Sequence, residues 1–185
     1  DEKGNNIFSG GDETGNDKLH NAVAGLLETM TDAVGIFAPN INSYRRFVPN
    51  TFAPMARRWA ANNRSVAVRI PSGDDANRRL EHRIAGADAN PYLSLAAVLA
   101  GIHHGITNNL TPPAISTGDA SLEPDPEFPT RWNWALNRLL KSELMADYLG
   151  EDYCKLYVAA KRDEMDSFMS KASSREYEWY LRSEG

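Results

Sequence analysis

A six-residue stretch, RRLEHR at positions 78–83, places three arginines around one glutamate. Alternate side chains of an extended strand share a face, so Arg79, Glu81 and Arg83 would point the same way. Neighbouring positive charge keeps a carboxyl group ionised, and such a carboxylate can ligate a hard cation such as Mg²⁺. The arginines could then hold the anionic groups bound to that cation, as phosphoryl transfer requires. An Arg–Glu–Arg ladder on a solvated sheet face is the structural alternative.

The same stretch closes a longer arginine-rich segment in a chain that is acidic overall. The formal net charge is −5, yet residues 45–83 contain nine arginines, no lysine and three acidic residues. Planar guanidinium groups bind phosphate and carboxylate in a bidentate manner, so this choice of residue favours recognition of small anions. A nucleic-acid surface is the alternative. The scarcity of aromatic residues in the segment and its acidic flanks disfavour it, and we expect no nucleic-acid partner.

The overall composition is that of a globular chain. The 185 residues suit one domain or part of a larger one, and 42% of them are hydrophobic. No apolar run approaches the roughly 20 residues that a membrane helix needs, so we expect no membrane partner. The single cysteine, Cys154, cannot form an internal disulfide, which predicts a reducing, cytoplasmic setting.

The elements that must position the arginines are predicted to be mostly helical. Apolar stripes predict helices over residues 18–37 (capped by Asp17), 90–106 (with Pro91 in its first turn), 131–140, 142–149, 152–169 and a terminal one in SREYEWYL. β-branched content predicts a strand at 64–70, and 79–85 is a second candidate. Residues 38–54 and the Pro-rich, acidic stretch 107–130 are predicted loops. The fold class is therefore α+β and helix-rich, with a few antiparallel strands.

Four motifs follow one another at close spacing: NSYRRFVP (42–49), NNRSVAVRIP (62–71), RRLEHR (78–83) and ADANPYL (87–93). Together they resemble the C-terminal half of the glutamine synthetase family, in particular its branch of γ-glutamyl-amine ligases such as γ-glutamylputrescine synthetase. The resemblance covers most of the chain and is strongest over residues 42–93. It implies that residues 1–185 form the C-terminal part of a glutamine synthetase-like catalytic domain, without the N-terminal domain and the upstream catalytic strands.

The resemblance implies substrate contacts for five arginines. Arg46 would hold the carboxylate of a glutamate substrate, and Arg83 would lie beside that glutamate and the transferred phosphate. Arg64 and Arg69 would be catalytic, because they would line the phosphates of ATP and the acyl-phosphate as it forms; Arg64 would also contact the glutamate. Arg79 would lie on the nucleotide side.

The resemblance further implies that Glu81 is a ligand of Mg²⁺ or Mn²⁺ and that ATP is the second cofactor. One geometric condition follows for the two catalytic arginines. Arg64 and Arg69 are an odd number of residues apart, so a regular strand would place them on opposite faces. The implied roles therefore require Arg64 to lie at the loop edge of the strand.

One position departs from the family pattern. Where glutamine synthetases carry a glutamate in a Pro-Gly-x-Glu-Ala-Pro loop, this chain reads PNTFAP (49–54), with Phe52 at the position of the glutamate and Asn50 in place of the glycine. That glutamate closes the family's site and helps to take a proton from ammonium. A phenylalanine can do neither, but it can pack against a hydrocarbon chain. Phe52 is therefore predicted to shape an acceptor loop that favours an alkyl amine or polyamine over ammonia.

These implications predict an ATP-dependent ligase that joins the γ-carboxyl group of glutamate to an amine, preferably a polyamine such as putrescine, through a γ-glutamyl phosphate. Glutamine synthetase proper, which uses ammonia, is one alternative. A non-catalytic relative that binds anions or nucleic acid is another. The family's other metal ligands would lie upstream of Asp1, so we expect this chain alone to be inactive. The resemblance also implies a ring-shaped homo-oligomer, such as a dodecamer, in the full-length protein.

Two further residues have ordinary structural interpretations. His82 would face away from the arginines, which predicts a packing role. Cys154 lies in an apolar helical stripe, which predicts a core position and an unreactive thiol.

Overall fold

The computed structural model describes residues 1–48 and 51–181. Its α-helices are α1 (Asp17–Phe37), α2 (Pro91–Thr107), α3 (Trp132–Lys141), α4 (Glu143–Leu149), α5 (Glu151–Met169) and α6 (Ser174–Tyr180). The strands are β1 (Trp59–Ala61), β2 (Val68–Ile70) and β3 (Glu81–His82), and the 3-10 helices are η1 (Ile41–Arg46), η2 (Asp75–Asn77) and η3 (Ala120–Leu122). The predicted helix-rich α+β class is confirmed.

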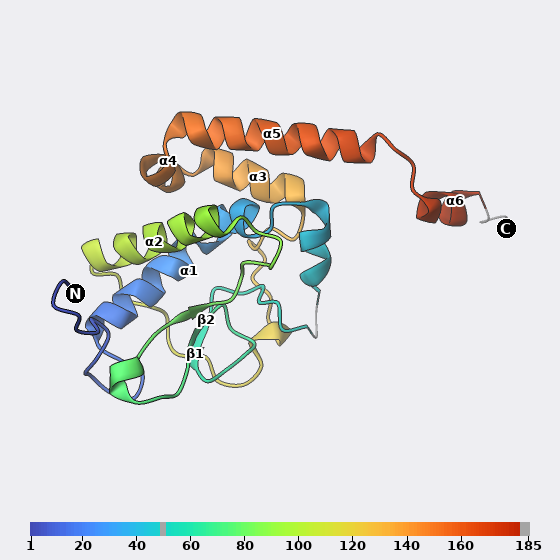
Figure 1. Ribbon diagram of the computed structural model, residues 1–185. Coiled ribbons are helices and arrows are strands. Elements are labelled where there is room, and N and C mark those ends of the chain that lie inside the picture. The colour runs from blue at the N-terminus through green and yellow to red at the C-terminus, as the bar shows by residue number, and fades with distance from the viewer. Residues whose placement is uncertain (49–50, 182–185) are drawn as a thin grey trace.

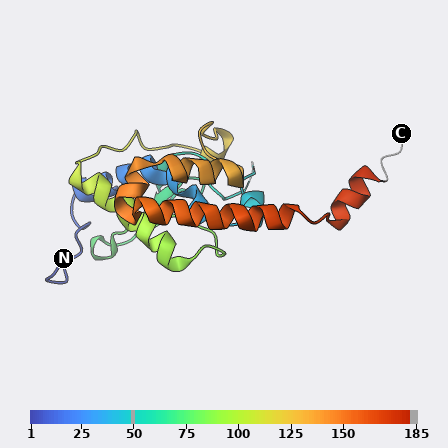
Figure 2. The same ribbon diagram turned by 90° about the horizontal axis from the view of Figure 1, so that it is seen from above.

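These elements form three layers (Figure 1). The small sheet forms one layer, α1 and α2 lie side by side next to it, and α3, α4 and α5 cover the other side of that helix pair. Figure 2 shows that the end of α5 and all of α6 extend beyond these layers. No helix in the described part of the chain is long and apolar enough to cross a membrane.

The predicted helices are confirmed to within one residue at each end. The predicted cap of the first helix is wrong, because Asp17 is already helical and the Asn16 side chain accepts the hydrogen bond from the backbone N–H of Leu19 (3.0 Å). Pro91 does occupy the first turn of α2. The predicted loop 38–54 contains the short helix η1, whose N-cap is Asn40.

The sheet is mixed and its strands are shorter than predicted. Its order is β1-β2-β3, with β1 parallel and β3 antiparallel to β2. The prediction of antiparallel strands therefore holds for one of the two pairs. The strand predicted over 64–70 begins only at Val68, because Arg64 and Ser65 form a turn in which the Asn63 side chain accepts from the Ser65 N–H (2.9 Å).

The two faces of the sheet differ in chemistry. Trp59 pairs with Val68 and Val68 with His82, so these side chains share the face that packs on α1. There the His82 ring lies against the ring of Phe37, with 4.5 Å between centroids. The opposite face carries the pair Arg69 and Glu81. The sheet thus buries one side and presents charge on the other.

The acidic loop 107–130 is bound to the arginine segment and to β1. The indole N–H of Trp59 donates to the carbonyl of Pro113 (2.7 Å). Arg57 donates to the carboxylates of Asp125 (2.5 Å) and Glu127 (2.9 Å), and Arg58 donates to that of Glu123. Arg57 and Arg58 therefore hold a loop in place, and only part of the arginine segment is free to bind small anions.

Glycine sets the spacing between α1 and α2. A Cβ atom added at Gly105 would collide with the carbonyl oxygen of Asn21 and would lie 2.8 Å from the backbone nitrogen of Gly25. A Cβ atom at Gly25 would in turn meet the backbone of Gly101 and Gly105. The two helix backbones are therefore in contact where these glycines meet, and a side chain at any of them would push the helices apart.

We predict that Gly105→Ala destabilises the full-length protein by about 1–3 kcal/mol, because overpacking at a backbone contact outweighs the better helix propensity of alanine. Thermal unfolding followed by circular dichroism measures the effect. Gly73→Ala is the matched control, since no atom lies within 4 Å of a Cβ at Gly73. Equal melting temperatures for the two variants would contradict close packing of α1 and α2.

The environment of His82 makes a second prediction, about pH. Burial lowers the pKa of His82 from 6.5 to about 4, and its Nε2 atom is buried without a hydrogen-bond partner among the described residues. The unfolded chain therefore takes up a proton near pH 6.5, whereas the folded chain stays neutral until about pH 4. Above about pH 6.5, His82 therefore does not reduce the free energy of unfolding. Between pH 6.5 and about pH 4 it lowers this free energy as the pH falls, by at most about 1.4 kcal/mol per pH unit.

We expect His82→Gln to reduce the loss of thermal stability between pH 7 and pH 5, because glutamine stays neutral in both states. The measurement is the difference in melting temperature between the two pH values, for wild type and variant. An equal difference in both proteins would show that other groups cause the acid sensitivity.

Candidate functional site

The charged face of the sheet is organised by one carboxylate. Arg69 lies directly across from Glu81 in the antiparallel pair, and its Nε and Nη2 atoms donate to Oε2 of Glu81 (2.7 and 2.5 Å). The Nε atom of Arg83 lies 3.6 Å from the other oxygen, Oε1. Glu81 thus contacts two guanidinium groups, one on each oxygen. Alternation along a strand predicts the contact with Arg83, whereas Arg69 comes from the neighbouring strand.

A third arginine joins this cluster through its backbone. The Nη1 atom of Arg83 donates to the carbonyl oxygens of Arg64 and Val66, the latter at 3.4 Å. Burial and the positive charges of Arg69 and Arg64 lower the pKa of Arg83, while Glu81 raises it. Arg64 lies in the turn before β2, as its predicted role requires.

Two guanidinium groups therefore contact one carboxylate, which leaves an excess of one positive charge. The side chain of Arg64 adds a further positive charge, close enough to Arg83 to lower its pKa. Arg64, Arg69 and Arg83 form no other ion pair among the described residues, and the side chain of Arg64 is exposed. The positive charges of neighbouring arginines repel one another, so an anion bound between them would be stabilised. The arrangement is suited to bind a phosphate or carboxylate group, with Glu81 holding two of the arginines in position.

Arg46 and Arg79, also predicted to contact substrates, lie at the margins of the cluster. Arg46 donates through Nη2 to the carbonyl of Ile84 (3.1 Å), just beyond Arg83, and its Nε atom is buried without a partner among the described residues. Arg79 is exposed and, among the described residues, bonds only to the nearby carbonyl of Asn77 (3.2 Å), so the structure does not bring it to Glu81.

The predicted acceptor-loop residue lies in the same cavity as Arg64. Phe52 is 72% exposed and lines a cavity of about 550 Å³ together with Arg64 and the residues around it. Pro49 and Asn50, the first residues of the PNTFAP loop, lie outside the described residues. The cavity combines an apolar ring and a guanidinium group, which fits an anion beside a hydrocarbon chain.

The predicted metal ligand does not make a metal site on its own. Across residues 1–48 and 51–181, no three His, Cys, Asp or Glu side chains gather closely enough to hold an ion. Glu81 is one carboxylate, and both of its oxygens face arginines, whereas Mg²⁺ needs a set of oxygen ligands. The residues described here therefore do not fit a complete Mg²⁺ or Mn²⁺ centre.

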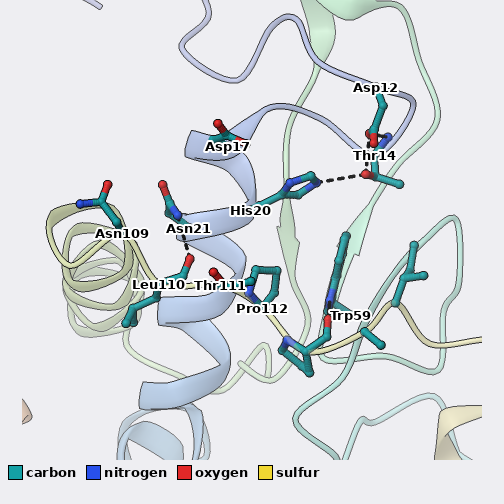
Figure 3. A pocket seen from close by; sticks show the side chains of 13 residues that line it. Asp12, Thr14, Asp17, His20, Asn21, Trp59, Asn109, Leu110, Thr111 and Pro112 are labelled. Carbon is teal, nitrogen blue, oxygen red and sulfur yellow. Dashed lines mark hydrogen bonds between the residues drawn. The ribbon is translucent and has the colours of Figure 1, made fainter.

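A larger cavity, of about 630 Å³, lies beside α1 and β1 (Figure 3). The ring of His20 reaches the hydroxyl of Thr14 (3.0 Å), which donates to Asp12 (2.6 Å). This hydrogen bond is the main cause of the lowered pKa of Asp12. On the same wall, Asn21 donates to the carbonyl of Leu110 (2.7 Å). These hydrogen bonds join two loops to α1, the one at Asp12 and Thr14 and the one at Leu110. The polar groups of the cavity thus serve to hold the structure together.

Sequence reasoning missed this second cavity, because its lining comes from three segments far apart in the chain. Trp59 lines it and lies on the sheet face opposite Arg69 and Glu81. The cavity is therefore separate from the arginine cluster.

Comparison with known proteins assigns this architecture. The chain matches the family model of the glutamine synthetase catalytic domain over residues 1–180. It is 40% identical over 180 residues to gamma-glutamylputrescine synthetase PuuA of Escherichia coli (strain K12), covering 97% of this chain and 38% of that protein. It is also 34% identical over 167 residues to a glutamine synthetase of Clostridium saccharobutylicum, covering 86% of this chain and 38% of that protein.

Two further relatives complete the comparison. The chain is 33% identical over 166 residues to gamma-glutamylethanolamide synthetase GlnA4 of Streptomyces coelicolor, covering 90% of this chain and 35% of that protein. A solved structure of apo GmaS without ligand superposes with a TM-score of 0.83 at 28% identity, covering 97% of this chain and 42% of that one. The chain thus spans less than half the length of these relatives.

The arginine cluster predicts a measurable affinity for simple anions. In the full-length protein, Arg64→Ala should weaken the binding of inorganic phosphate about tenfold or more, because it removes a charge-assisted hydrogen bond. The shift of the melting temperature with phosphate concentration measures this affinity. Arg58→Ala is the control, because Arg58 pairs with Glu123. Equal phosphate affinity in wild type and Arg64→Ala would contradict the anion site.

Proposed function

This chain belongs to the glutamine synthetase family, and from that membership we propose that the full-length protein is an ATP-dependent ligase joining the γ-carboxyl group of glutamate to an amine. One observation carries the proposal: Arg69 and Arg83 contact Glu81 on the charged face of the sheet, and the positive charge of Arg64 is close enough to Arg83 to lower its pKa. Such a cluster can neutralise the charge of a phosphoryl group during its transfer. The relatives above add support, since their names describe ligases of this kind.

The proposed reaction has two steps. An oxygen of the γ-carboxylate attacks the terminal phosphorus of ATP, the bond to the bridging oxygen breaks, and ADP leaves. The amine nitrogen then attacks the carbonyl carbon of the γ-glutamyl phosphate, phosphate leaves with the former carboxylate oxygen, and the nitrogen loses a proton. In both steps, Arg64, Arg69 and Arg83 would bind the oxygens of the transferred phosphoryl group, and Arg46 would bind a carboxylate of glutamate.

The proposed acceptor is an alkyl amine, with a polyamine such as putrescine preferred. Phe52 stands in the cavity beside Arg64, where its ring can cover a hydrocarbon chain but cannot take a proton from ammonium. The E. coli relative is by name a synthetase of γ-glutamylputrescine. Glutamine synthetase proper is the second candidate, favoured by the relative from C. saccharobutylicum.

Several further properties of the full-length protein are part of the same proposal. ATP and a divalent cation would be its cofactors, with Glu81 as one ligand and the remaining ligands outside the described residues. The chain of 185 residues would then release no ADP in an assay by itself. A ring-shaped homo-oligomer and a cytoplasmic location remain predictions. A relative that only binds anions or nucleic acid would instead show salt-sensitive binding without ADP release.

ADP release by the full-length protein, measured with glutamate and a series of amines, tests the proposal. We expect putrescine to be used more efficiently than ammonium. The substitution Phe52→Glu should shift the ratio of the two kcat/KM values at least about tenfold towards ammonium, because it restores a carboxylate and removes an apolar surface.

Two outcomes would contradict this account. Absence of glutamate-dependent ADP release with any amine would refute the ligase itself. A wild-type preference for ammonium, unchanged by Phe52→Glu, would refute the role of Phe52 and favour glutamine synthetase proper.

A further inference from the structure

The cavity that contains Phe52 and Arg64 has a second charged wall. Gly118 and Asp119 also line it, and they come from the loop 107–130, more than fifty residues later in the chain. An apolar ring, a guanidinium group and a carboxylate thus line one cavity. Together, the three groups restrict the kind of ligand that the cavity can bind more than any one of them would alone.

Two hydrogen bonds hold the backbone at Asp119 next to that of Arg64. The side-chain amide of Asn63 donates to the carbonyl of Gly118 (2.7 Å), and the backbone N–H of Ala120 donates to the hydroxyl of Ser65 (2.9 Å). These bonds join the neighbours of Arg64 to the neighbours of Asp119 on both sides. The backbone at Asp119 is therefore held beside the turn that carries Arg64, although the two lie in different loops.

Asp119 is ionised and has no cationic partner among the described residues. Hydrogen bonds from Ser121 lower its pKa, and its Oδ1 atom accepts from the backbone N–H of Ser121 (2.9 Å). The next acids of the same loop, Glu123 and Asp125, are paired with arginines. Asp119 makes no such pair, although Arg64 lines the same cavity. Its carboxylate can therefore bind a cation from solution.

We propose that Asp119 binds the distal ammonium group of a diamine acceptor, an inference that rests on the proposed ligase function. One nitrogen of the diamine attacks the acyl-phosphate held by the arginines, and the other stays protonated. The methylene chain between them lies along the ring of Phe52, and the protonated end pairs with Asp119. Ammonia and monoamines lack this second charge, so Asp119 is a specificity-determining residue for diamines.

The test compares two acceptors that differ only at the distal end. Putrescine and n-butylamine share a four-carbon chain, but only putrescine carries a second ammonium group. In the full-length protein, Asp119→Asn should lower kcat/KM for putrescine about tenfold and leave that for n-butylamine nearly unchanged. Asparagine caps a helix as well as aspartate does, so the substitution removes the charge and keeps η3 capped.

Glu123→Gln is the matched control, because it removes a carboxylate of the same loop that pairs with Arg58 and does not line the cavity. We expect it to leave the ratio of putrescine to n-butylamine unchanged. An Asp119→Asn protein that keeps the wild-type ratio would overturn the inference while leaving the ligase proposal intact. If the wild-type protein used no amine at all, the ligase proposal would fail first, and the role of Asp119 with it.

Discussion

The site depends on the attraction between one carboxylate and the guanidinium groups around it. Glu81 pairs with Arg69 across two strands and with Arg83 two residues further along the chain. Arg83 in turn binds the backbone of the turn at Arg64. Without Glu81, the arginines would repel one another and lose their common anchor. With it, they stay close together and still carry more positive charge than the carboxylate can neutralise.

A sheet of three very short strands cannot hold such a cluster alone, because isolated strands are marginally stable in water. Its apolar face therefore rests on α1, where the ring of His82 meets that of Phe37. The loop 107–130 closes the edge at β1 through Trp59 and through the ion pairs of Arg57 and Arg58. The same loop brings Asp119 to the cavity of Phe52. The same loop thus anchors the sheet and carries Asp119 to this cavity.

Much of this architecture could be predicted from local sequence. The helices follow from apolar periodicity, and the contact of Glu81 with Arg83 follows from alternation along a strand. The position of Arg64 at a loop edge followed from the implied roles combined with the odd spacing to Arg69. What could not be predicted depends on tertiary contacts. The ion pairs of Arg57 and the approach of Asp119 both require the loop 107–130 to fold back, and no local pattern encodes that.

The central claim is that the arginine cluster serves the transfer of a phosphoryl group to the γ-carboxylate of glutamate. The most direct measurement uses the full-length protein with ATP, an amine and glutamate labelled with ¹⁸O in its γ-carboxyl group. A γ-glutamyl phosphate requires one labelled oxygen to leave with the phosphate in each turnover. We predict that the released inorganic phosphate carries this label. Amide formation with unlabelled phosphate would contradict the account.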